Sequence, residues 1–255
     1  MPSRIRFLFM VLLCVRSYAS SLTEDKSAEQ LLLQLDRIRL PARSFIVDLA
    51  MADYRQGRKE REGTFRLYSR RTATGFDSLA LCLTPAADRN KLLLSKGQRL
   101  WFYDPRSARP VPVSPSQFRS HSFVLDLFGA ALSSDYSAEL EGQATTTDLG
   151  RHEITASRLK LTSRTRTGMI RYWFDKDSSR FLRSDIFAGN GKLLRTTYYG
   201  DFKTALGEQR PMRLVVVDPV NNSAHEIKFS GFSYRDTPDA VFDESQLSAA
   251  ATFLK

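Results

Sequence analysis

The chain has 255 residues, 42% of them hydrophobic, and a formal net charge of +10. That length and hydrophobic content fit one large β domain or two small ones. No linker, internal repeat or long low-complexity tract divides the chain, so we expect a single domain. The basic surplus would favour anionic lipid head groups or an acidic partner, but a solvated basic surface explains it equally well.

The first residues resemble an export signal. Arg4 and Arg6 form a basic start, residues 7–15 are an apolar core, and Ala19 offers a small residue at a cleavage site. The apolar run is shorter than the roughly 20 residues that span a bilayer. A retained membrane anchor or a buried first strand is the alternative. We predict a signal peptide over residues 1–19 and a mature domain over residues 20–255.

Cysteine usage indicates neither a lipid anchor nor a disulfide. Cys14 follows Leu13, whereas a lipidation site needs a small residue before the cysteine. Once the signal is removed, Cys82 is the only thiol, so an internal disulfide is excluded. Cys82 lies in an alternating apolar strand, where packing explains it better than reactivity.

The first predicted elements are a helix and three antiparallel strands. Residues 24–40 form the helix, which Thr23 caps and Pro41 ends. Apolar residues then alternate as in strands whose inner face is buried. The residues that share a face are Phe45, Val47, Leu49 and Met51; then Phe65 and Leu67; then Leu79, Leu81 and Leu83.

A second hairpin and a second helix follow. Residues 91–95 and 99–104 are apolar strands around a turn at Lys96 and Gly97, and a loop with four prolines comes next. Residues 116–140 then predict a helix with a broad apolar face. The residues of that face are Phe123, Val124, Leu125, Leu127, Phe128, Ala131 and Leu132. Such a face indicates a lid over the sheet, with a ligand or further packing beneath it.

The rest of the chain alternates strands with short turns. The predicted strands are 153–162, 169–175, 181–188, 192–202, 209–218 and 225–234. Together with the earlier ones they make about eleven strands, which predicts a meandering barrel or strongly curved antiparallel sheet. A sheet of that size can enclose an apolar cavity.

Catalytic and metal sites are not indicated. The three histidines, His121, His152 and His225, lie in different elements without metal-ligand spacing. His121 with Ser122 and Asp126 lacks the GxSxG elbow of a serine hydrolase. We therefore expect no enzyme, no metal and no cofactor, and the basic runs at hairpin ends carry no nucleic-acid motif.

Two aromatic segments leave a choice open. Trp101, Phe102 and Tyr103 are consecutive in one strand, and Tyr172 alternates with apolar residues around Trp173. Continuous apolar runs in an antiparallel sheet predict that both of its faces are covered. Periodicity alone favours ordinary sandwich core over a cavity wall backed by a helix.

Several segments resemble the LolA-like family of periplasmic outer-membrane lipoprotein-sorting proteins, in particular its uncharacterised exported subgroup. They are PAADR at 85–89, LLL at 92–94, LWFY at 100–103, the run 109–117, 198–202, RPM at 210–212 and PDAVFDESQL at 238–247. The resemblance covers about residues 28–247. It departs at residues 118–132, which are more apolar than the subgroup's usual segment.

The resemblance implies an incomplete antiparallel β-barrel of about eleven strands closed by a helical lid, with a cavity for acyl chains. The expected function is a monomeric periplasmic carrier or chaperone of lipoprotein or lipid acyl chains, served by an inner-membrane transporter. The alternative is an envelope sensor or accessory subunit of an inner-membrane exporter. The residues expected to line the cavity and lid are Phe45, Val47, Leu49, Leu79, Leu81, Leu92, Leu94, Trp101, Tyr103, Phe123, Leu127, Phe128, Leu132 and Tyr172.

Overall fold

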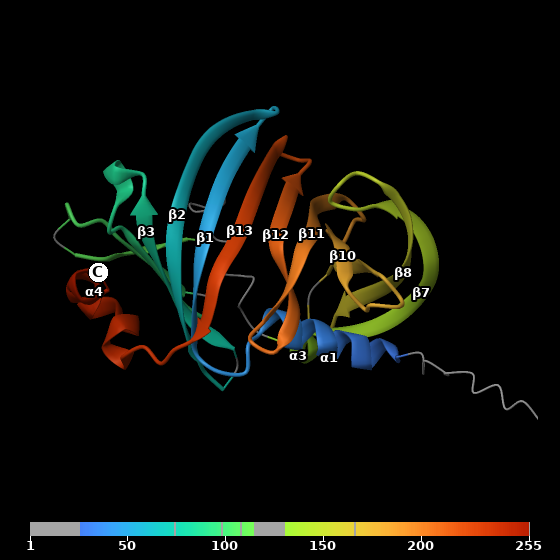
Figure 1. Cartoon of the computed structure of the whole chain (residues 1–255), viewed down its shortest axis with the longest axis horizontal. Helices are drawn as coiled ribbons and strands as arrows, with labels where there is room; N and C mark the ends of the chain where they lie inside the picture. Colours follow the sequence, from blue (N-terminus) through green and yellow to red (C-terminus); the bar gives the residue numbers. More distant parts are fainter. Residues whose placement is uncertain are drawn as a thin grey trace, which may run out of the picture.

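A computed structural model describes residues 26–73, 75–97, 99–107, 109–114, 131–165 and 167–254. These residues form one antiparallel sheet of 13 strands, accompanied by short helices (Figure 1). The predicted signal peptide, and residues 116–130 of the predicted lid, lie outside the described residues.

The strands follow one another along the sheet almost in chain order. They are β1 (Phe45–Arg55), β2 (Arg58–Arg71), β3 (Phe76–Thr84), β4 (Leu92–Lys96), β5 (Arg99–Tyr103), β6 (Val111–Val113), β7 (Tyr136–Thr147), β8 (Glu153–Ser163), β9 (Met169–Phe174), β10 (Phe181–Phe187), β11 (Leu193–Ala205), β12 (Glu208–Asp218) and β13 (Ser223–Tyr234). The pairing of β1 with β13 joins the two ends of the chain, and β6 and β7 become the two edges. The sheet is therefore an open, incomplete barrel, as the alternating pattern predicts.

All eleven predicted strands are present, and β6 and β7 are additional. The β6 strand contains Pro112, which an edge strand tolerates because one side of it makes no ladder hydrogen bonds. The β7 strand pairs with β8 along its whole length. Half of its 12 residues are exposed and only Thr146 is buried, so it lacks the strong apolar alternation that identifies a buried strand.

The predicted helix over 116–140 is wrong at its C-terminal end. Only Leu132–Asp135 (α3) is helical among its described residues, and the chain is extended from Tyr136 onward. Pairing with β8 overrides the helix preference of Ala138, Glu139 and Leu140.

The first helix is shorter than predicted. It spans Ala28–Arg39 (α1), and the cap is Ser27 rather than Thr23. Ser27 and Gln30 form a capping box, in which each side chain bonds the backbone N–H of the other residue. Leu31, Leu32 and Leu35 lie on one face of α1 and pack against β8, β9 and β10.

The two faces of the sheet are covered differently at its two ends. In Figure 1, α1 lies beneath β12, β11 and β10, whereas the C-terminal helix α4 (Leu247–Phe253) lies at the opposite end beside β3. The helical turn η3 (Asp239–Phe242) packs with α4 against the outer face of β3, β4 and β5. The outer face of these strands is thus covered by the C-terminal segment, which fits the alternative of a strand wall backed by a helix.

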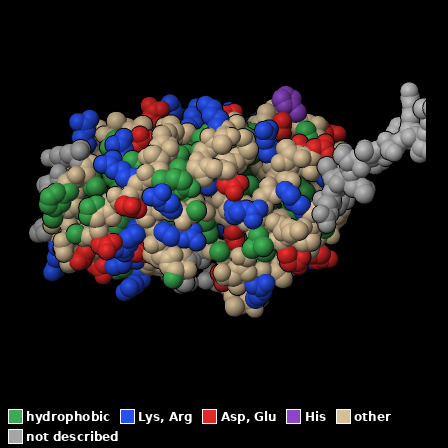
Figure 2. Space-filling view, turned by 60° about the horizontal axis from the view of Figure 1, so that its bottom comes forward, with side chains coloured by type: hydrophobic (Ala, Val, Ile, Leu, Met, Phe, Trp, Pro, Cys, Tyr) green, Lys and Arg blue, Asp and Glu red, His purple; other side chains and the backbone are tan. Residues whose placement is uncertain are grey.

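Charges of both signs are spread over the surface. Figure 2 shows Lys and Arg side chains interspersed with Asp and Glu on the face viewed there. On that face the basic surplus is a dispersed, solvated one. None of the helices in the described part of the chain has the length and apolarity needed to cross a membrane.

Candidate functional site

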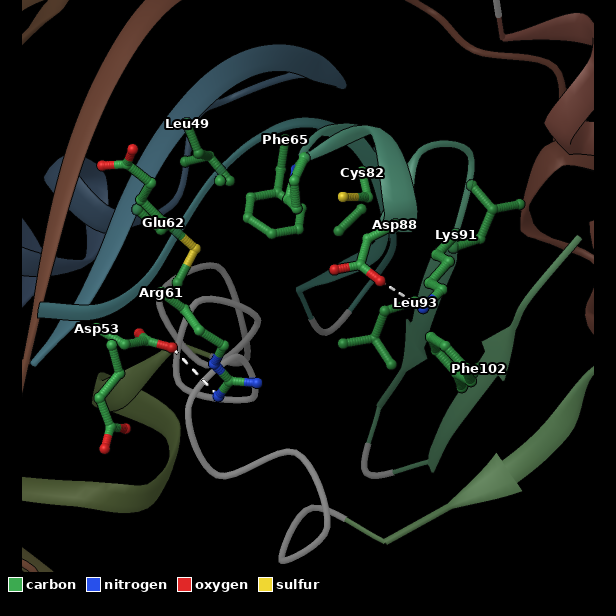
Figure 3. Close-up of a pocket in the computed structure, with 16 residues that line it drawn as sticks. Leu49, Asp53, Arg61, Glu62, Phe65, Cys82, Asp88, Lys91, Leu93 and Phe102 are labelled. Atoms are coloured by element: carbon green, nitrogen blue, oxygen red, sulfur yellow. Dashed lines mark hydrogen bonds and ion pairs between the residues drawn. The ribbon is translucent and has the colours of Figure 1, made fainter. Parts of the chain in front are cut away.

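A cavity of about 500 Å³ lies against the concave face of β1 to β5. Its apolar wall is built from alternate residues of neighbouring strands, because side chains two apart share a face. These residues are Leu49 and Met51 on β1, Phe65 on β2, Ala80 and Cys82 on β3, Leu93 on β4 and Phe102 on β5. Figure 3 shows Leu49, Phe65, Cys82, Leu93 and Phe102 surrounding the space.

The rim of this cavity is charged, and its ions are paired. Arg61 Nη2 lies 3.4 Å from Asp53 Oδ2, and Lys91 Nζ donates to Asp88, as the dashed lines of Figure 3 mark. The hydrogen bond to Asp88 raises the pKa of Lys91, so the ammonium stays charged at neutral pH. An apolar wall below a wet, ionic rim suits an amphiphile whose chain enters the cavity.

The thiol of Cys82 belongs to the apolar wall. The residue is 5% exposed, and burial raises the pKa of its thiol to about 11. Since the thiolate is the reactive form, Cys82 is a packing residue at neutral pH, as its strand position predicts.

The histidines and turn carboxylates of the described residues serve structure. His225 Nδ1 lies 2.8 Å from Asp53 Oδ1, a pair that links β13 to β1. His152 bonds Asp148 at a turn, and Asp175 accepts the backbone N–H groups of the next turn. No cluster of three metal-ligating side chains occurs among the residues that the structure describes.

The structure divides the predicted cavity residues into separate groups. Phe45, Val47 and Leu49 lie on the concave face, in the cluster that forms the cavity wall. A second group packs against η3 and α4 on the outer face; it comprises Leu79, Leu81, Leu92, Leu94, Trp101 and Tyr103, of which Leu92 also borders the cavity. Leu132 and Tyr172 join the cluster under α1. Phe123, Leu127 and Phe128 lie outside the described residues.

Strand parity explains this division. In β3 and β5, Ala80, Cys82, Leu100 and Phe102 face inward, while their sequence neighbours meet the C-terminal helix. Both faces of these strands are apolar, so hydrophobicity alone does not distinguish them. The pairing of the strands identifies the inner face, because Leu49 of β1 pairs with Phe65 of β2 and Phe65 pairs with Cys82 of β3.

A second, smaller cavity of about 70 Å³ lies between α1 and strands β10 to β13. Its wall is mostly aromatic and aliphatic, with two arginines; the lining residues are Leu35, Ile38, Arg39, Phe181, Tyr199, Phe202, Arg210, Pro211, Leu214, Phe229 and Phe232. Burial raises the pKa of the Tyr199 phenol, whose hydroxyl bonds Ser184 at 2.9 Å. Leu214 and Phe229 also belong to the concave-face cluster, so this cavity borders the same apolar interior.

Comparison with known proteins gives a consistent result. A family model described as an uncharacterized protein matches residues 75–249, more than half of the chain. Among curated proteins none matches.

Three solved structures share the fold at near-complete coverage. A LolA superfamily protein from Nitrosomonas europaea is 26% identical, with a TM-score of 0.69 over 86% of this chain and 98% of that one. A DUF1329 family protein from Desulfovibrio piger is 21% identical, with a TM-score of 0.70 over 88% and 98%. A domain described as an outer membrane lipoprotein-sorting protein from Vibrio parahaemolyticus is 17% identical, with a TM-score of 0.67 over 87% and 100%. The last two likenesses show the fold alone.

Proposed function

This chain belongs to the uncharacterized family whose model it matches and to the wider LolA-like group, and from that premise we propose that it is a periplasmic lipid or lipoprotein carrier. It binds acyl chains in the concave cavity and moves them between membranes without catalysis. Residues 1–19 direct export, and residues 20–255 form the carrier domain.

The observation that carries this proposal is the concave cavity itself. Its volume of about 500 Å³ falls in the range of small-molecule sites, and its wall is apolar from Leu49 to Phe102. A cargo that is recognised by its acyl chains needs an apolar wall and does not need a set of polar side chains pointing at it. The paired charges at the rim then face water.

The energetics of acyl burial are sufficient without polar anchors. Each buried methylene contributes about 0.8 kcal/mol, so burying about ten of them gives roughly 8 kcal/mol. Taken alone, that burial corresponds to a Kd of about 1 μM, and the cost of immobilising the chain makes the net affinity weaker than this.

A vesicle transfer assay tests the proposal. Donor vesicles carry a pyrene-acyl phospholipid, acceptor vesicles are unlabelled, and transfer is followed by the loss of pyrene excimer fluorescence. We expect the transfer rate to rise in proportion to protein concentration, while a non-exchangeable lipid marker stays in the donors. A rate equal to that without protein, together with no binding of the free probe, would contradict the carrier and favour the envelope-sensor alternative.

A further inference from the structure

Arg210 is a cation on the apolar, inward face of β12. It shares that face with Leu214 and Val216, and its whole residue is only 3% exposed. It lines the smaller cavity beside Phe229 and Phe232. A guanidinium in such surroundings requires hydrogen-bond acceptors and a counter-charge, because an unpaired buried ion costs several kcal/mol.

The protein supplies only part of that requirement. Arg210 Nε donates to the Ala205 carbonyl at 2.9 Å, and Nη2 donates to the Arg37 carbonyl near the end of α1 at 3.1 Å. Its Nη1 is buried without a hydrogen-bond partner. A guanidinium carries five N–H donors, so these two bonds leave most of its capacity unused.

No carboxylate in the described part of the chain lies within ion-pair distance of Arg210. The acid that acts on it most is Glu208, which instead pairs with Arg37 at 3.7 Å. Burial lowers the pKa of Arg210, which is the expected effect of desolvation without a close counter-ion. The Arg37 carbonyl at the end of α1 therefore holds the guanidinium of Arg210 in place but does not balance its positive charge.

The adjoining cavity has room for an anionic group. Its 70 Å³ exceeds several-fold the roughly 10–15 Å³ that one water molecule needs on the same measure. Arg39 is a second cation that lines this cavity. Its Nη1 lies 3.5 Å from Asp36 Oδ1, with which it forms an ion pair. The remaining wall is apolar, so a hydrocarbon chain attached to an anion held here would contact apolar side chains directly.

We infer that Arg210 binds the anionic head, a carboxylate or a phosphate, of a single-chain amphiphile whose chain lies along the concave apolar face. This inference rests on the proposed carrier function and narrows its cargo. A free fatty acid carries its charge at the end of its chain, and a lysophospholipid carries a phosphate beside its single ester-linked chain, whereas the ester- and amide-linked chains of a lipoprotein anchor have no such anionic group. The site thus selects a free fatty acid or a lysophospholipid over a fully acylated anchor.

The test compares the fluorescent fatty acid cis-parinaric acid with its methyl ester on delipidated protein. Wild type should bind the acid at least about tenfold more tightly than the ester, since charged hydrogen bonds distinguish the two. In Arg210→Met the two affinities should agree within about twofold. Arg213→Met is the matched control: the same strand and substitution, but Arg213 pairs with Glu226 on the opposite face and its variant should keep the preference.

Competition identifies the head group. Displacement of the acid by oleate, or instead by oleoyl lysophosphatidate, assigns a carboxylate or a phosphate, and both support the site. Displacement by millimolar inorganic phosphate as effectively as by either lipid would overturn it, because the site would then bind a free anion. If Arg210→Met does not fold, the ratio of acid to ester affinity is compared between wild type and Arg210→Lys. A preference for the acid in both proteins supports the site, and its absence in wild type overturns it.

The outcomes separate the two proposals. Equal binding of acid and ester by wild type overturns the role of Arg210 and leaves the carrier intact. Retention of the acid preference in Arg210→Met also overturns it. Failure of both probes to bind contradicts the carrier itself.

Discussion

Filling the concave cavity should weaken acyl binding strongly without unfolding the protein. Ala80 lies on β3, faces the cavity beside Phe102 and is only partly buried, so an indole at this position can extend into the open space. If Ala80→Trp displaces about four methylene groups of a bound chain, the loss is ~3 kcal/mol. The Kd for an acyl probe should therefore rise roughly 200-fold.

The assay is titration of a fluorescent acyl probe, with the urea unfolding midpoint measured in parallel. The matched control is Ala50→Trp, which introduces the same side chain at an exposed position on the outer face of β1. The control should bind like wild type. Unchanged affinity in a folded Ala80→Trp protein, or an equal loss in Ala50→Trp, would refute the assignment of the cavity.

Three further substitutions test the supports of the sheet. Asp36→Ala removes the buried carboxylate that accepts two backbone N–H groups at the start of α3, and should lower the free energy of unfolding by about 2–4 kcal/mol in urea titrations. Phe242→Ala leaves a cavity under α4 and should cost about 3–5 kcal/mol, yet leave acyl affinity unchanged because Phe242 lies on the outer face; a weakened Kd would contradict that placement. The hydrogen bond from Arg171 lowers the pKa of Glu141 below its usual 4.5, so Glu141 stabilises the fold above pH 4.5 and loses this effect as the pH falls. Wild type should therefore exceed Glu141→Gln in stability at pH 7, with the difference in urea midpoint shrinking below pH 4.5.

Much of the fold could be predicted from the sequence, because its strands alternate strongly. Phe45, Val47 and Leu49 share a buried face, and the eleven strands of this kind were identified. The edge strand β7 could not be predicted, since only Thr146 of its residues is buried and the strand is defined by its pairing with β8. The cap of α1 differs for a local reason, since Ser27 and Gln30 bond reciprocally at the start of the helix.

The candidate site was predicted less completely. The second face of β3, β4 and β5 is apolar because η3 and α4 pack there, and a contact between segments about 150 residues apart leaves no periodic signal in either. Leu79 and Leu94 were therefore expected in the cavity and lie outside it. A signal for Arg210 does exist, since it alternates in register with Leu214 and Val216, and a charge on an otherwise apolar face marks a site.

The most direct test of the proposed carrier is native mass spectrometry of the protein after gentle purification from its native host, with lipid extraction of the same sample. The carrier predicts a peak above the polypeptide mass by the mass of one or more acyl-containing lipids, and the extract should contain the same species. Ala80→Trp, purified in parallel, should carry less of it. A single peak at the bare polypeptide mass, with an extract free of stoichiometric lipid, would contradict the central claim.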